Sequence, residues 1–182
     1  MKKILTATFS MFSLISLSLM FCSFSYGQTD ASKASNNNAY LEVFGNGGLY
    51  SLNYERIVVE HFALRVGFAS WKSGDLFGAG NTSFITVPVL GNLFFGERKS
   101  KLELGAGFLF GHKKFTSSRG GSNKSSSIFD LTGVIGYRYQ PSTAGFMFRV
   151  GATPFYALKV GNDAFPKDGL FVSGGLSIGY SF

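Results

Sequence analysis

Histidine and serine are the side chains of this sequence that could support catalysis, and they occur together near residue 112. His112 is followed by Ser117 and Ser118, and a histidine base beside a serine nucleophile is the pairing used in acyl transfer. That reaction also needs a group that orients the base, and no spacing in the sequence brings all three groups together. Glu103 and Asp130 could form a carboxylate pair, but we expect ion pairing for both. We therefore predict no catalytic residue.

Metal and cofactor chemistry is not expected from the sequence. The chain has two histidines and a single cysteine, Cys22, which lies in a segment that we expect to be removed. These side chains are too few for a zinc site. No glycine-rich phosphate loop stands between a predicted strand and a predicted helix. We therefore predict no metal ligand and no cofactor.

Four cations near one predicted loop could bind phosphate groups. They are Lys113, Lys114, Arg119 and Lys124. Ammonium and guanidinium groups bind phosphate oxygens well, although an ordinary solvated loop is the alternative. Nucleic acid is not an expected partner, because these charges are few and the chain carries an export signal.

The composition favours one compact domain with little solvated surface. The chain has 182 residues, and its 17 Lys and Arg against 10 Asp and Glu give a formal net charge of +7. Charged residues make up 15%, hydrophobic residues 45% and aromatic residues 16%. The aromatic content argues against a disordered chain, and one cysteine cannot form a disulfide within it.

The N-terminal segment is typical of a secretory signal peptide. Lys2 and Lys3 precede an uncharged run rich in Leu, Phe and Ser, and small residues at Ser25 and Gly27 permit cleavage before Gln28. A retained membrane anchor is the alternative. We expect residues 1–27 to be the signal peptide, 28–38 a flexible leader and 39–182 the folded domain.

The folded domain has the period of β-strands. Residues 62–69 place Phe, Leu, Val and Phe on one face and Ala, Arg, Gly and Ala on the other. Similar runs recur near residues 50–55, 87–95, 102–111, 129–139, 146–153 and 170–182. No long segment has a helical period, so we predict an all-β, antiparallel up-and-down fold.

The connections favour a transmembrane barrel of eight strands. Longer polar loops near 73–81, 116–126 and 158–168 alternate with short turns near 58–61, 96–100 and 140–144, as in outer-membrane barrels. If both ends of the chain lie on the periplasmic side, the number of strands must be even. The alternating runs number seven, so we expect Tyr40–Phe44 to supply the eighth strand, joined to the next by the turn Gly45-Asn46-Gly47-Gly48. One long strand over 39–57 with a glycine bulge is the alternative, and a soluble sandwich is the other architecture to consider.

The inner faces carry charges that must pair with one another. We expect a lumen network of Glu42, Glu55, Arg65, Glu103, Asp130, Arg138 and Arg149. Buried charges without partners are costly, and eight strands leave an interior just wide enough for side chains. Small glycines on the same faces leave room for the arginines. Pro88 and Pro154 each remove a ladder donor, so we expect them at a bulge or outside the hydrocarbon zone.

The C-terminal strand ends in Gly179-Tyr180-Ser181-Phe182, which resembles the assembly signal of outer-membrane barrels. With the signal peptide and the even strand count, the chain resembles the small OmpA-like and OmpX-like barrels over residues 39–182. The resemblance implies a bacterial outer-membrane location, recognition of Tyr180 and Phe182 by the barrel-assembly machinery, contact with lipid and lipopolysaccharide, and a monomer.

The expected function is structural or surface interaction through a barrel plugged by its own ion pairs. A narrow channel for ions or small solutes is the first alternative. A lipid A-modifying enzyme is the second, although the His-x-Ser spacing of the barrel lipid A deacylases is absent, because Lys113 and Lys114 follow His112. The four cations near the second long loop would then contact lipopolysaccharide phosphates.

Overall fold

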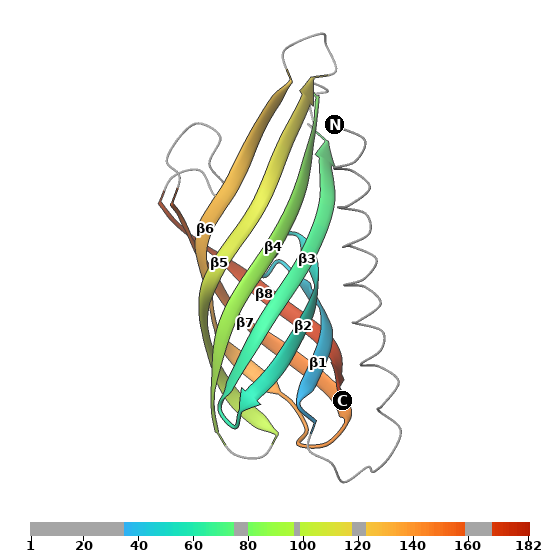
Figure 1. Ribbon diagram of the computed structural model, residues 1–182, viewed down its shortest axis with the longest axis vertical. Coiled ribbons are helices and arrows are strands. Elements are labelled where there is room, and N and C mark those ends of the chain that lie inside the picture. Colours follow the sequence, from blue (N-terminus) through green and yellow to red (C-terminus); the bar gives the residue numbers. More distant parts are fainter. Residues whose placement is uncertain (1–34, 75–79, 97–98, 118–122, 159–168) are drawn as a thin grey trace, which may run out of the picture. The chain divides into compact units, whose positions relative to one another are not determined.

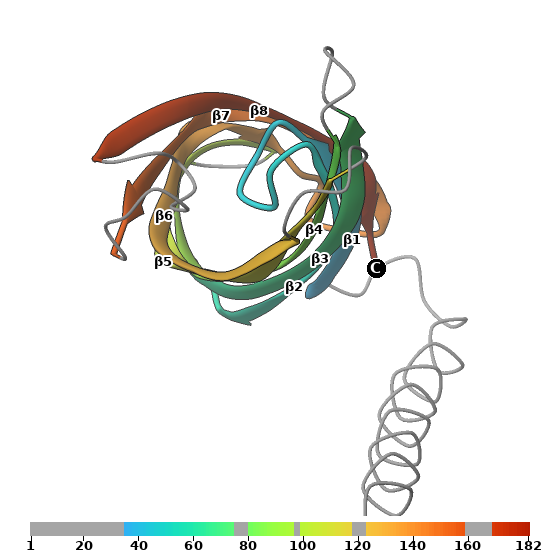
Figure 2. The ribbon, with the colours of Figure 1, turned by 90° about the horizontal axis from the view of Figure 1, so that it is seen from above.

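The computed structural model is a closed antiparallel barrel, which confirms the predicted fold class and strand number. It describes residues 35–74, 80–96, 99–117, 123–158 and 169–182, and the predicted signal peptide lies outside them. The strands are β1 (Asn37–Val43), β2 (Tyr50–Val59), β3 (Phe62–Gly74), β4 (Gly80–Phe95), β5 (Ser100–Ser117), β6 (Lys124–Tyr139), β7 (Gly145–Ala157) and β8 (Leu170–Ser181). Each strand pairs with its sequence neighbours, and β1 pairs with β8 to close the barrel (Figures 1 and 2). None of the described residues forms a helix long and apolar enough to cross a membrane.

The two faces of each strand follow the period of the sequence, with apolar side chains outside. In β3 the outward Leu64 is 54% exposed, whereas the inward Arg65 is 1% exposed. This is the reverse of a soluble domain, where burial of the Leu and Phe faces would stabilise the fold. A closed cylinder also leaves no free edge in its paired part, so the backbone groups there bond to neighbouring strands. The soluble sandwich is therefore wrong.

The first two predicted strands are separate, so the alternative of one long strand over 39–57 is wrong. The Phe44 N–H bonds to the Leu49 carbonyl at 3.0 Å, and the Gly48 N–H bonds to the Gly45 carbonyl at 2.9 Å, which closes the connection. Gly48 has a φ of 102°, a conformation that glycine adopts without strain. β1 begins at Asn37, so the folded domain starts two residues before the predicted boundary at 39.

Neither proline lies at the bulge that was one of the two positions predicted for it. Pro88 pairs with Leu109 and Pro154 pairs with Val172, and the strand register continues past both. Each proline leaves a short gap in the pairing with the opposite neighbour, β3 for Pro88 and β6 for Pro154. The missing N–H therefore interrupts one ladder locally, without a bulge.

The strands β3, β4, β5 and β6 extend beyond the rest of the barrel at one end (Figure 1). In the described chain, pairing of β2 with β3 stops at Phe68, and pairing of β7 with β6 stops at Asp130. We call the extension the blade; it comprises Ala69–Gly74, Asn81–Thr86, Gly111–Ser117 and Lys124–Phe129. Its inner face continues the lumen face, and its outer face continues the apolar face.

Candidate functional site

Six charged side chains from six strands meet inside the barrel. They are Glu42 on β1, Glu55 on β2, Arg65 on β3, Glu103 on β5, Arg138 on β6 and Arg149 on β7, and all are buried. Strand parity points each one inward, and eight strands bring them within contact distance of one another.

These side chains form one alternating series, which we call the ion chain. Arg65 pairs with Glu42, and Arg149 Nη2 lies 3.8 Å from the other Glu42 oxygen. Arg149 Nε also lies 2.8 Å from Glu103, which is 3.7 Å from Arg138 Nη1. Arg138 ends the series by pairing with Glu55. Three positive and three negative groups balance, so no net charge is buried by the series.

Aromatic rings separate the guanidinium groups of the ion chain. Tyr40 lies between two arginines, with its ring centre 5.4 Å from Arg65 and 5.1 Å from Arg149. Arg149 also donates to the Tyr40 hydroxyl at 2.7 Å. Phe94 lies under Arg138 at 4.5 Å. Cation–π contact stabilises a desolvated guanidinium where no further carboxylate is present.

Buried amides link the ion chain to the barrel wall, and the sequence prediction omitted them. Arg65 donates to Asn53 from Nε at 3.0 Å, and both Asn38 and Asn92 donate to Glu55 at 2.9 Å. Gln140 in turn donates to Asn38 at 3.0 Å. Their inward parity could have identified Asn38 and Asn53, because they share faces with Glu42 and Glu55.

The connection between β1 and β2 folds into the barrel instead of away from it (Figure 2). We call Phe44–Leu49 the inner loop. The Asn46 side chain donates to the Thr132 hydroxyl at 2.7 Å and to the Gly133 carbonyl at 2.8 Å, across the lumen. It also accepts from Arg65 at 2.9 Å. Asn46 thereby joins the inner loop to the ion chain and to β6.

The rest of the inner loop is held from two sides. The Asn46 N–H bonds to Glu42 at 3.0 Å, and the Thr86 hydroxyl donates to the Gly47 carbonyl at 2.7 Å. A Cβ added at Gly48 would lie 2.4 Å from the Trp71 ring, so this ring rests directly on the loop. Sequence reasoning found the hairpin, but it did not predict that the connection would turn inward.

Two expectations about the lumen differ from the structure. Asp130 faces inward and is buried, but it forms no ion pair with a described residue, so it is not a member of the ion chain. The inward-facing glycines of the strands make room for amides, and the side chains nearest to Gly67 and Gly105 are asparagines, not arginines. A Cβ at Gly67 would lie 2.3 Å from the Asn53 amide oxygen, and one at Gly105 would lie 2.2 Å from that of Asn92.

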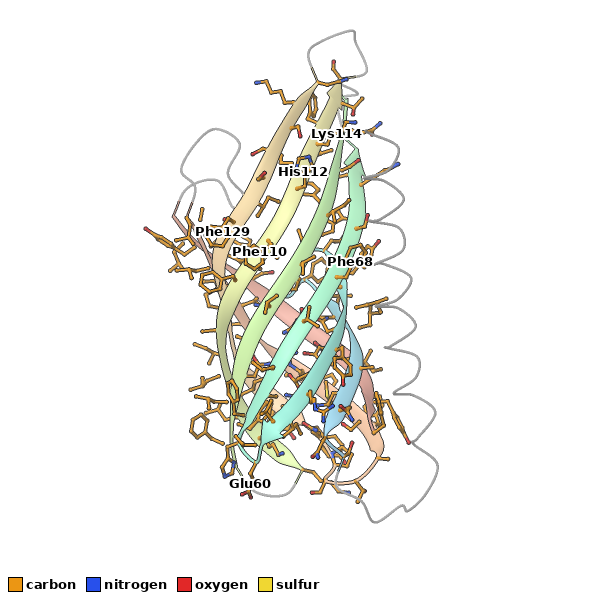
Figure 3. The ribbon with its side chains drawn as sticks, viewed as in Figure 1. Glu60, Phe68, Phe110, His112, Lys114 and Phe129 are labelled. Carbon is orange, nitrogen blue, oxygen red and sulfur yellow. The ribbon has the colours of Figure 1, made fainter. Side chains whose placement is uncertain are left out.

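The predicted phosphate-binding cations divide between the two faces of the blade. Lys113 and Lys124 lie on the inner face and line a groove of about 290 Å³. Lys114 lies on the outer face, above His112 and the Phe110 and Phe129 rings (Figure 3). Arg119 lies outside the described residues. Alternation along β5 separates Lys113 from Lys114, so the four cations do not form one site.

The structure pairs His112 with a serine other than those expected. His112 Nε2 lies 2.7 Å from the Ser125 hydroxyl on the neighbouring strand β6. Ser117 is at the end of β5, five residues further along, and Ser118 is outside the described residues. Both members of the His112–Ser125 pair are exposed.

The C-terminal residues complete the barrel wall. Tyr180 points outward from β8 and is exposed. Phe182 exchanges two backbone hydrogen bonds with Asn37, at 2.8 and 3.0 Å. The last residue of the sequence therefore joins the first strand to the last.

Comparison with known proteins supplies the fold class. No protein-family model and no curated protein sequence matches the chain. The N-terminal β-barrel domain of OprF from Pseudomonas aeruginosa is 16% identical, with a TM-score of 0.54 over 82% of this chain and 100% of that domain. Neisserial surface protein A is 15% identical, with a TM-score of 0.51 over 81% of this chain and 92% of that protein. The chain therefore has the closed eight-stranded fold of the small outer-membrane β-barrels.

Proposed function

We propose that the protein is a structural and surface-interaction barrel of the bacterial outer membrane. The apolar outer face fits lipid, because Leu, Val and Phe side chains cover it and charged groups of the ion chain lie inside. The fold class supports the same location. The mechanism is mechanical: a rigid cylinder holds the blade above the membrane, where it can meet partners.

The ion chain is the observation that carries this proposal over the narrow channel. The space beside Glu42, Glu103 and Arg149 admits no water-sized sphere, and the inner loop lies above it. A permeating ion would have to separate buried pairs, which costs several kcal/mol each. Single-channel recording in planar bilayers tests this. We expect no steady open level from the folded protein, and a stable conductance would assign the channel instead.

We also propose that the outer face of the blade binds lipopolysaccharide phosphates. Lys114 and Lys72 share one outward row with Ser83 and Ser125, since Lys72 pairs with Ser83, Ser83 with Lys114 and Lys114 with Ser125. The Phe110–Phe129 pair lies nearer the membrane on the same face, so the ammonium groups stand at headgroup height.

Retention of lipopolysaccharide during purification tests the outer-face site. We expect Lys72→Gln/Lys114→Gln to lower the bound amount, because two phosphate contacts are lost. Lys113→Gln/Lys124→Gln is the matched control, since it removes the same charge from the inner face. Equal retention by the wild type and the outer-face variant would contradict the proposal.

Hydrolysis of a lipid ester is the second candidate, and the His112–Ser125 contact favours it. His112 could take the proton of the Ser125 hydroxyl as that oxygen attacks an ester carbonyl, and it could return the proton to the alcohol as the ester C–O bond breaks. Water would then hydrolyse the acyl-serine and release the fatty acid. The pair lies on the outer face of the blade, near the expected headgroup level. Mass spectrometry of lipid A from cells with wild-type or Ser125→Ala protein tests it. Loss of acyl chains that requires Ser125 would establish the enzyme, and identical lipid A would remove it.

A further inference from the structure

The inner face of the blade carries a basic groove that the proposed barrel function leaves unused. Strand register defines its position. Trp71, Phe84, Lys113 and Ser126 form one cross-strand row, and Ser73, Thr82, Phe115 and Lys124 form the next row outward. The groove of about 290 Å³ is lined from these rows by Thr82, Lys113, Phe115, Lys124 and Ser126, and Ser125, between Lys124 and Ser126 on β6, also lines it.

An apolar cluster lies between the groove and the ion chain. Phe84, Leu109, Ile128 and Phe155 pack into one buried cluster, and Trp71 packs against it. Trp71 also stacks on Phe84, with ring centres 5.0 Å apart. A ligand in the groove would therefore be separated from the ion chain by this apolar layer.

The electrostatics of the groove favour an anion. Lys113 and Lys124 lie diagonally across β5 and β6, because Lys113 is opposite Ser126 and Phe115 is opposite Lys124. The two rows contain no carboxylate. Neither lysine forms an ion pair with any residue in the described part of the chain. Two ammonium groups held this close repel each other, so an anion between them would be bound more tightly than by a single lysine.

The other side chains of the groove favour a saccharide. Thr82 and Ser126 supply hydroxyl groups that can donate to or accept from sugar hydroxyls. Phe115 lies between Thr82 and Lys124 in its row, so its ring is beside both kinds of polar group. A sugar ring has an apolar C–H face that can pack on the Phe115 ring, and hydroxyl groups that can bond to Thr82 and Ser126. Acidic substituents on the sugar can pair with the two lysines.

From this arrangement we infer that the groove binds an anionic oligosaccharide, sulfated or phosphorylated, which arrives from outside the cell. The inference rests on the proposed outer-membrane location of the barrel. The inner face points toward the barrel axis and away from lipid, so the headgroups beside the outer face do not reach it (Figures 1 and 2). The occupant is therefore distinct from the lipopolysaccharide proposed for Lys72 and Lys114.

Binding of labelled dextran sulfate oligosaccharide to the full-length mature protein, folded in detergent micelles, tests the inference by fluorescence anisotropy. Neutral dextran of the same length is the matched probe. We expect saturable binding of the sulfated probe alone. Lys113→Gln/Lys124→Gln should weaken it by about tenfold or more, since charge-assisted contacts are lost. Phe115→Leu should weaken it as well, because the ring face is removed and the charge is kept.

Lys72→Gln/Lys114→Gln is the matched control, because it removes the same charge from the opposite face of the same strands. Equal weakening by both double variants would show non-specific attraction and overturn the inference, as would equal binding of the neutral dextran. Displacement of the labelled probe by lipid-free core oligosaccharide from the cell's own lipopolysaccharide, at lower concentrations than unlabelled dextran sulfate requires, would also overturn the assigned source.

Two readouts keep this inference separate from the barrel proposal. Heat-modifiable migration on a gel shows that each variant is folded, because a small barrel resists detergent until it is boiled. Lipopolysaccharide retention and conductance report on the outer face and the lumen. A protein that retains no lipopolysaccharide, or that shows a steady conductance, while it still binds dextran sulfate would contradict the proposed function and leave the groove assignment standing.

Discussion

Arg149 holds the centre of the ion chain. It lies between Glu42 and Glu103 and donates to the Tyr40 hydroxyl, so three buried groups depend on one guanidinium. An intact buried ion pair contributes little net stability, because the desolvation of both charges offsets their attraction. Removal of one partner is strongly destabilising, because it leaves the other charge buried without compensation. The ion chain should therefore behave as a coupled unit.

Arg149→Gln should destabilise the folded barrel by about 3–5 kcal/mol, because it leaves the negative groups of the series in excess. Urea unfolding in lipid vesicles, followed by tryptophan fluorescence, measures the change. The double variant Arg149→Gln/Glu103→Gln restores the charge balance and should recover part of the loss. A single variant that unfolds no earlier than the double variant would contradict the coupling.

Single residues also show what sequence can and cannot predict. Period two correctly pointed Glu42, Glu55, Arg65 and Arg138 inward, because side-chain alternation is a local property of a strand. It could not separate Asp130 from the ion chain, since contacts across a lumen depend on the heights of distant strands. The same alternation puts Lys113 and Lys114 on opposite faces of the sheet. The prediction of one phosphate-binding set overlooked this, because it grouped the cations by their proximity in the sequence.

At the scale of elements, the inner loop is the part that sequence could not place. The glycines and Asn46 predicted a hairpin, and the hairpin is present. Its inward turn depends on Thr132 and Gly133 of β6, more than eighty residues away. Such long-range partners leave no periodic signal in the sequence.

Asn46→Ala should lower the free energy of unfolding by about 1–3 kcal/mol, because Thr132, Gly133 and Arg65 each lose a buried partner. The same urea unfolding measures it. Asn81→Ala, at an exposed position of β4, is the control and should have little effect. Equal stability of the Asn46 and Asn81 variants would show that the inner loop is not anchored through this amide.

β8 gives a prediction about assembly. Phe182→Ser keeps the backbone bonds to Asn37 and removes the terminal aromatic ring, which the assembly machinery is expected to recognise. We expect less heat-modifiable protein in the outer-membrane fraction, with Phe182→Tyr close to wild type. Equal amounts of assembled wild type and Phe182→Ser would exclude the terminal ring as an assembly signal.

For the whole molecule, the sequence predicted the architecture because several local signals agree. Alternating faces, an even strand count and loops of two lengths together favour a closed barrel. The unequal strand heights were not predicted, since β3 to β6 continue past the predicted strand runs and a short way into the predicted loops near 73–81 and 116–126. The blade and the difference between its inner and outer faces were therefore found only in the three-dimensional structure.

Export makes a prediction for the whole chain. The mature protein should begin at Gln28, after removal of the segment that ends in Ser25-Tyr26-Gly27. N-terminal sequencing of protein from the membrane fraction measures this directly. A mature protein that still begins at Met1 would assign a retained anchor in place of a signal peptide.

The proposed outer-membrane location requires contact between the outer apolar face and lipid, and quenching of tryptophan fluorescence by acyl-brominated lipids measures that contact. Trp71 is the only tryptophan and lies on the inner face, so wild-type emission should be quenched weakly. Leu64→Trp in a Trp71→Phe background puts the ring on the outer face, where strong quenching is expected. Folded Leu64→Trp protein whose emission is no more quenched than that of Trp71 would contradict the account.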